Sequence, residues 1–181
     1  LTSGERNMAI GYTAGQDMTT GDDNVLIGWE VAKDATTGFL KNVGIGNYAF
    51  QQVAAGVDAE NNTAVGFGTL AGVMTNAAHD NTAIGKQALN VLTSGLENTA
   101  IGSGALDGLT AGGYNTAVGK DALGNATTQS DQNTAIGRAA MSGAIGTEDV
   151  NFCTAVGDAA LAGTLVAAAS GATAVGKSAL G

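Results

Sequence analysis

The sequence has no proline, one cysteine and few aromatic residues: four Phe, three Tyr and one Trp among 181 positions. A single cysteine, Cys153, excludes an internal disulfide framework. So few aromatics are atypical of an ordinary globular core, although 44% of the residues are hydrophobic. That hydrophobic content is also atypical of a disordered chain. Twenty-nine glycines among small apolar residues favour a thin, closely packed core.

Positive charge is also scarce, with 7 Lys and Arg against 16 Asp and Glu and a net charge of −9. This balance argues against nucleic acid as a partner, since phosphate backbones are bound by basic side chains. It argues equally against a polybasic membrane contact. No apolar run approaches the roughly 20 residues of a membrane span. The first residues, LTSGERN, lack the features of a signal peptide. Leu1 is not a natural start, so we expect a processed chain or an excised fragment.

A nine-residue phrase, N-T-A-[IV]-G-x-x-A-L, can be followed at ten places along the chain. Cys153 and Ala172 replace its Asn in the last two copies. In the other copies the Asn positions are Asn7, Asn24, Asn42, Asn62, Asn81, Asn98, Asn115 and Asn133. Such a regular internal repeat predicts a solenoid or an array of stacked units.

A second, longer period organises the ten copies. Successive phrases lie 17, 18, 20, 19 and 17 residues apart, and the series then repeats after 91 residues. The residues agree, because LTSGERN at 1–7 aligns with LTSGLEN at 92–98. The sequence therefore predicts one repeat domain, 1–181, made of two five-coil blocks, 1–91 and 92–181, and belonging to a longer fibre.

The phrase itself predicts the shape of each coil. Its N-T-A-[IV]-G core alternates and contains β-branched residues, as short strands do. We expect A-L to begin a second extended segment, and a polar turn to lead to the next Asn. Stacked coils would align the asparagines in a hydrogen-bonded ladder, and the repeated glycine would mark close backbone approach. The two 20-residue coils should bulge near residues 51–60 and 142–151.

The Val or Ile of the phrase is predicted to form a core column with the Leu. That column comprises Ile10, Ile27, Ile45, Val65, Ile84, Ile101, Val118, Ile136, Val156 and Val175. So small a coil leaves one strand face apolar and exposed, and a closed three-fold arrangement of parallel coils would bury it. Either the small Ala and Gly or the Val and Ile can line that axis.

The tenfold phrase resembles the head repeats of YadA-like trimeric autotransporter adhesins, and more closely the longer-period repeats of phage tail fibres. The resemblance implies an all-β, left-handed parallel β-roll or β-solenoid of ten 17–20-residue coils, assembled as an intertwined or side-by-side homotrimer. It implies a fibre shaft or head at a bacterial cell surface or virion, outside the cell. It also implies attachment to a host without enzymatic activity or a cofactor.

Other functions are weighed against this one. IGKQAL fits the hexapeptide pattern of β-helix acyltransferases, but the single His79 lies in a predicted turn rather than in the partnered setting of a general base. A monomeric solenoid binding glycan or ice is the other alternative, although only one Thr per coil follows the Asn. The acidic residues before the Asn, such as Asp80, lack the spacing of calcium ligands, so no metal site is predicted.

The position after the glycine of the phrase varies most. It holds Tyr12, Trp29 and Phe67 in the first block, with Tyr48 nearby, and mostly Lys or Arg in the second. Exposed aromatic rings mark interaction surfaces. These four residues are therefore the candidates for contact with a host-surface glycan or protein receptor.

Overall fold

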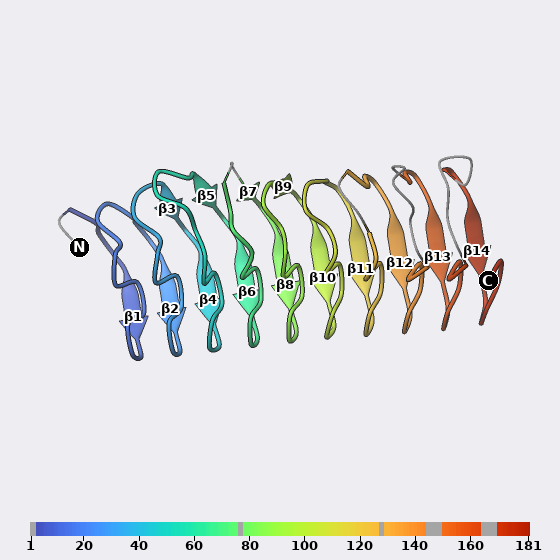
Figure 1. Ribbon diagram of the computed structural model, residues 1–181, viewed down its shortest axis with the longest axis horizontal. Coiled ribbons are helices and arrows are strands. Elements are labelled where there is room, and N and C mark those ends of the chain that lie inside the picture. The colour runs from blue at the N-terminus through green and yellow to red at the C-terminus, as the bar shows by residue number, and fades with distance from the viewer. Residues whose placement is uncertain (1–2, 76–77, 127–128, 144–149, 164–169) are drawn as a thin grey trace.

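The protein is a rod of stacked coils, with the two ends of the chain at opposite ends of the stack (Figure 1). The computed structural model describes residues 3–75, 78–126, 129–143, 150–163 and 170–181. One strand of each coil joins a ten-stranded parallel sheet that runs the length of the rod. Four further strands form a second, smaller parallel sheet beside its first part. The predicted all-β solenoid of stacked coils is confirmed.

Fourteen short strands make up the two sheets in the described residues. The long sheet has the order β1 (Met8–Ile10), β2 (Val25–Ile27), β4 (Val43–Ile45), β6 (Thr63–Val65), β8 (Thr82–Ile84), β10 (Thr99–Ile101), β11 (Thr116–Val118), β12 (Thr134–Ile136), β13 (Thr154–Val156) and β14 (Thr173–Val175). The short sheet has the order β3 (Phe39–Leu40), β5 (Ala59–Glu60), β7 (Ala78–His79) and β9 (Gly95–Leu96).

The register of the long sheet follows the repeated phrase without a slip. Thr99 pairs with Thr82 on one side and with Thr116 on the other, and Ala100 and Ile101 pair likewise. The pairing between β8 and β10 joins the first 91-residue block to the second. Because every coil repeats the same strand, each side chain lies above its equivalent in the next coil.

The predicted asparagine ladder is present and is buried over most of its length. Each Asn from Asn24 to Asn133 donates its backbone N–H and its side-chain amide to Oδ1 of the Asn one coil earlier. The amide of Asn98 also donates to the carbonyl of Gly112, at 2.8 Å. Both side-chain donors and both acceptor positions of such an Asn are therefore used, as burial requires.

The predicted core column of Val and Ile is wrong for the single chain. In β8 the middle residue, Ala83, is fully buried, whereas Ile84 is 39% exposed. The same pattern recurs in the other central strands, so the small residue packs inside and the branched residue faces outward. The reason is space: the interior already holds Leu89 and Leu92 from the same coil, and a thin coil accommodates only a small side chain opposite them.

The A-L part of the phrase forms a turn rather than the predicted second strand. Its Leu is buried but adopts a left-handed backbone conformation, with φ 50° at Leu89. Gln87 and Asp80, at two other corners of this coil, have φ 58°. These three N–H groups donate to carbonyls of neighbouring coils, at 2.9–3.1 Å. Bonding between coils thus offsets a conformation that costs about 1–2 kcal/mol per residue.

The glycine of the phrase is required by close approach, as predicted. At Gly85, φ is +134° and a Cβ would lie 2.5 Å from the carbonyl of Gly102, closer than any side chain tolerates. The bulge predicted near 51–60 agrees with a turn in which Ala55 and Gly56 are exposed. The central part of the other predicted bulge, 144–149, lies outside the described residues.

Candidate functional site

The outer face of the long sheet carries two parallel columns. One is threonine from β6 onward, with Met8, Val25 and Val43 in the first three strands, and the other is Val or Ile throughout. In β8, β10 and β12 the Thr is half-buried and the Ile is 38–41% exposed. At the ends of the stack the exposure rises to 55% for Ile10 and 69% for Val175. No charged residue belongs to the ten strands of this sheet. The result is an uncharged, partly apolar strip along the whole rod.

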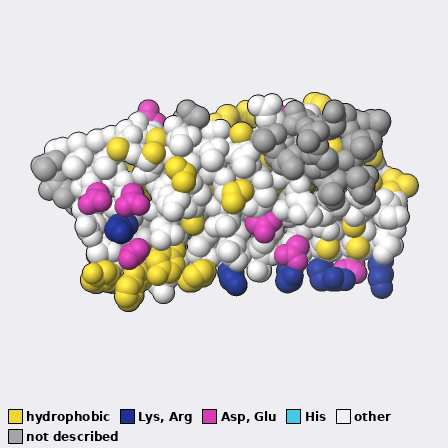
Figure 2. Space-filling view, viewed as in Figure 1, with side chains coloured by type: hydrophobic (Ala, Val, Ile, Leu, Met, Phe, Trp, Pro, Cys, Tyr) yellow, Lys and Arg dark blue, Asp and Glu magenta, His cyan; other side chains and the backbone are white. Residues whose placement is uncertain are grey.

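The edge of the rod formed by the tight turns after these strands divides into two parts. Figure 2 shows apolar side chains gathered along the lower edge near the N-terminal end, and Lys and Arg side chains along the same edge further on. The predicted recognition residues Tyr12, Trp29, Tyr48 and Phe67 belong to the turns that follow the first four strands of the long sheet. We call this group of four the aromatic edge.

The structure brings the aromatic edge together as two ring pairs. The ring centroids of Tyr12 and Trp29 are 5.1 Å apart, and those of Tyr48 and Phe67 are 5.5 Å apart in an edge-to-face arrangement. Tyr12, Trp29 and Phe67 are 48–65% exposed, and Tyr48 is half-buried. Such spacings are typical of favourable aromatic pairs, so the aromatic edge consists of two interacting ring pairs.

The second part of this edge carries Lys and Arg side chains and includes two ion pairs. Lys120 pairs with Asp121, and Nε of Arg138 lies 2.8 Å from Oδ1 of Asp158 in the next coil. All four side chains are at least one-third exposed, so these pairs contribute little to stability. Further along the coil, the carboxyl of Asp107 lies in a hollow with Asp121. Partial burial, and then the charge of Asp121, raise the pKa of Asp107.

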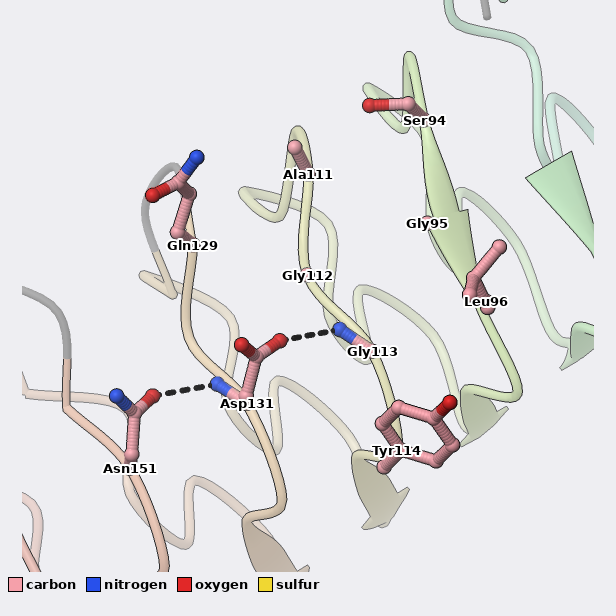
Figure 3. A pocket seen from close by; sticks show the side chains of 10 residues that line it. All are labelled: Ser94, Gly95, Leu96, Ala111, Gly112, Gly113, Tyr114, Gln129, Asp131 and Asn151. Carbon is pink, nitrogen blue, oxygen red and sulfur yellow. Dashed lines mark hydrogen bonds between the residues drawn. The ribbon is translucent and has the colours of Figure 1, made fainter. Parts of the chain in front are cut away.

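A different hollow of about 530 Å³ lies over coils six to nine (Figure 3). It begins at β9, on the side of the rod away from the tight turns (Figure 1). Three adjacent chain segments line it: Ser94 to Leu96, Ala111 to Tyr114, and Gln129 with Asp131. Asn151 of the following coil completes the lining. Three of these residues, Gly95, Gly112 and Gly113, have no side chain, which leaves the hollow open between its polar and aromatic walls.

Two side chains in this hollow are held by backbone N–H groups. Oδ1 of Asp131 accepts from the N–H of Gly113 at 2.6 Å, and Oδ1 of Asn151 accepts from the N–H of Asp131 at 2.7 Å. The repeated phrase does not include these residues, so sequence reasoning missed them. The available signal was the Gly-Gly at 112–113, where four earlier coils carry a strand of the short sheet.

The other chemically reactive residues do not form a reactive group. His79 lies in β7 and lines a shallow hollow with carboxylates that include Glu60, its pairing partner in β5. Cys153 is buried at the end of the ladder, where its N–H donates to Oδ1 of Asn133. Asp23 pairs with Arg6, which lowers the pKa of its carboxyl. Within the described ranges no three His, Cys, Asp or Glu side chains cluster in a way that could hold a metal ion.

Comparison of the chain with family models, curated proteins and solved structures finds no match. In the part of the chain that the structure describes, no helix is long and apolar enough to cross a membrane.

Proposed function

We propose that this chain is a shaft or head segment of a homotrimeric fibre, as in a phage tail fibre or a trimeric surface adhesin. The fibre would act outside the cell, on a bacterial surface or virion, and attach it to a host cell or surface. A contact with a host glycan or protein receptor would be made at the aromatic edge. The proposal follows the sequence resemblance and assigns no catalytic step to the chain.

The observation that carries the proposal is the uncharged Thr and Val/Ile strip of the long sheet. Ile84, Ile101 and Ile136 are each about 40% exposed, in a chain whose interior is filled mostly by Ala and Leu. A continuous uncharged and partly apolar strip of this length is unusual on the surface of a soluble monomer and is typical of an interaction surface. Burying it would add apolar contact in every one of the ten coils.

The regularity of the strip argues that its partner is another copy of the chain. A partner must present matching groups at each of ten successive coils, and the same strip on a second chain has that period. Cyclic association closes such surfaces without leaving one exposed. With three parallel chains, each strip faces the shared axis, in agreement with the trimer that the resemblance implies.

The test of this proposal is the mass of the purified chain in solution. Sedimentation equilibrium at several concentrations should give about three times the chain mass of 17.6 kDa. The double variant Ile84→Asp with Ile101→Asp should sediment as a monomer and keep the far-UV circular dichroism of the parent. Two carboxylates per chain would otherwise be desolvated next to their copies, whereas both side chains are exposed in the single chain.

Val91→Asp is the matched control, because Val91 is 37% exposed but lies outside the strands of the long sheet. It should leave the trimer intact. A parent chain that is folded and monomeric at every concentration would contradict the proposal. The strip would then be free, which would favour the alternative of a monomeric solenoid that binds a glycan or ice; an acyltransferase remains the least supported reading.

A further inference from the structure

The hollow of coils six to nine differs in sequence from the equivalent place in the first block. Residues 91 positions apart are equivalent in the two blocks. The first-block equivalents of Gly113 and Tyr114 are Asp22 and Asp23. Those of Asp131 and Asn151 are Leu40 and Glu60. Leu40 belongs to β3 of the short sheet. At these positions the first block has three carboxylates and a strand of the short sheet in each of two coils. The second block has no strand there, and Tyr114, the single carboxylate of Asp131 and the amide of Asn151 surround the open space.

The polar groups of the hollow are oriented before any ligand arrives. One carboxylate oxygen of Asp131 is bonded to the N–H of Gly113, and the oxygen of the Asn151 amide is bonded to the N–H of Asp131 (Figure 3). Within the part of the chain that the structure describes, no partner is recorded for Oδ2 of Asp131 or Nδ2 of Asn151. The hollow therefore presents a hydrogen-bond acceptor and, one coil further on, a donor.

Apolar surface lies beside these polar groups. The ring of Tyr114 is 51% exposed and the side chain of Leu96 is 38% exposed, and both line the hollow. Its volume of about 530 Å³ is within the range of small-molecule sites, about 300–1,000 Å³. A ligand that fits has one apolar face for the ring and several hydroxyls for the acceptor and donor.

We propose that this hollow binds one neutral pyranose unit of a glycan. The C–H face of the sugar would lie on Tyr114, and its hydroxyls would donate to Asp131 and accept from Asn151. As a second receptor contact of an adhesive fibre, besides the aromatic edge, the site rests on the function proposed above. As a sugar site, it depends only on the fold of coils six to nine.

The charge of the hollow selects among ligands. Asp131 and the net charge of −9 disfavour anionic sugars and phosphate. Calcium and magnesium prefer several oxygen ligands, usually with more than one carboxylate, and among the described residues of the lining Asp131 supplies the only carboxylate. A neutral, hydroxyl-rich ring is the class that uses every group present.

The experiment uses the whole chain and saturation-transfer NMR with the methyl pyranosides of glucose, galactose, mannose and N-acetylglucosamine. N-acetylneuraminic acid serves as the anionic comparator. At least one neutral sugar should bind with a Kd of about 1–10 mM, typical of a single small site, and more tightly than the anionic sugar. Tyr114→Ala, and separately Asp131→Asn, should each weaken that binding about tenfold or more.

Two variants serve as matched controls. Phe152→Ala removes an exposed ring from the same corner position two coils away, where Phe152 has φ 61° and Tyr114 has φ 62°. Asp22→Asn alters a carboxylate whose Oδ1 accepts from the N–H of Glu5 at 2.7 Å, the same kind of bond that Asp131 makes. Both variants should bind the sugar as the parent does.

The outcomes separate this inference from the proposed trimer. A trimer by sedimentation that binds none of the neutral sugars overturns the hollow as a sugar site and leaves the fibre proposal standing. If the chain is a monomer that binds a neutral sugar, and Tyr114→Ala and Asp131→Asn bind that sugar more weakly, the result supports the sugar site and overturns the trimer. Unchanged binding in Tyr114→Ala and Asp131→Asn, or equal loss in the controls, overturns the assignment to this hollow.

Discussion

The two 91-residue blocks share the strand register and the asparagine ladder but differ in the side chains at the turns of their coils. The strand register and the asparagine ladder continue from one block into the next through Asn81 and Asn98. In the first block, Phe39 and Phe50 are buried with their rings 5.2 Å apart. Their equivalents 91 residues later are Ser130 and Met141, and no strand of the short sheet forms at Ser130.

The exposed turns differ in the same way. The aromatic edge belongs to the first block, and at the positions of Trp29 and Phe67 the second block has Lys120 and Asp158. Stacking constrains the ladder, the small inner residue and the glycine, because each contacts its equivalents above and below. Corner residues face solvent on one side, so the two copies can diverge there without disturbing the register. The candidate sites of both blocks lie at such corners.

The largest expected effect is the loss of the aromatic pair in the first block. Phe39→Ala should lower the free energy of unfolding by about 3–5 kcal/mol, because the thin coil cannot collapse around the cavity. Urea titration at one fixed protein concentration, followed by the fluorescence of Trp29, the only tryptophan, reports on this block. Phe67→Ala is the control, since Phe67 is 51% exposed; an equal loss there would contradict the comparison.

A smaller effect of opposite sign is expected at the equivalent position of the second block. Ser130 is fully buried, and its hydroxyl has no hydrogen-bond partner among the described residues. Ser130→Ala should therefore raise the free energy of unfolding by about 1 kcal/mol, since it removes an unsatisfied polar group. Urea titration followed by far-UV circular dichroism measures it. Ser103→Ala, at an exposed position, should change nothing, and a loss of stability in Ser130→Ala would show that its hydroxyl is satisfied.

The smallest effect concerns Asp107, whose equivalent in the first block is Gln16. Partial burial and Asp121 raise the pKa of Asp107 above its usual 3.8, so the folded chain holds this proton more tightly than the unfolded chain does. Stability from this group is therefore present below pH 3.8 and is lost as the pH rises through the raised pKa.

Asp107→Gln should accordingly stabilise the protein at pH 7, by about 0.5 kcal/mol or less for so exposed a pair. Its advantage over the parent should shrink as the pH falls through the raised pKa and should be absent below pH 3.8, where Asp107 is protonated in both states. Urea titrations of both proteins at pH 3 and pH 7 test this. An advantage that grows towards acid pH would show that the sign is wrong.

Individual residues show which features of the fold could be predicted from the sequence. The eight asparagines and the glycine after each strand were assigned to a ladder and to close approach, because a stacked repeat gives each of them one possible partner. The orientation of the strand was not determined in this way. Thr-Ala-Ile alternates, and either Ala83 or Ile84 can face inward until the volumes of Leu89 and Leu92 are placed beside them.

The hollow was beyond sequence reasoning for a different reason. Its lining comes from segments that end at Leu96, Tyr114 and Asp131, and from Asn151, which are 17–20 residues apart in the chain and adjacent only after stacking. None of them belongs to the repeated phrase. A glycine pair at 112–113 indicates missing side chains but not what surrounds the gap.

The sequence by itself determined the all-β coil, its tenfold stacking and its register, since one phrase repeated at nearly constant spacing has a single way to align with itself. Only the tertiary structure decided which strand face is buried, where the short sheet begins and ends, and which corners form surfaces. Those features depend on the volumes and hydrogen bonds of side chains from neighbouring coils, which interact only when the coils are in contact.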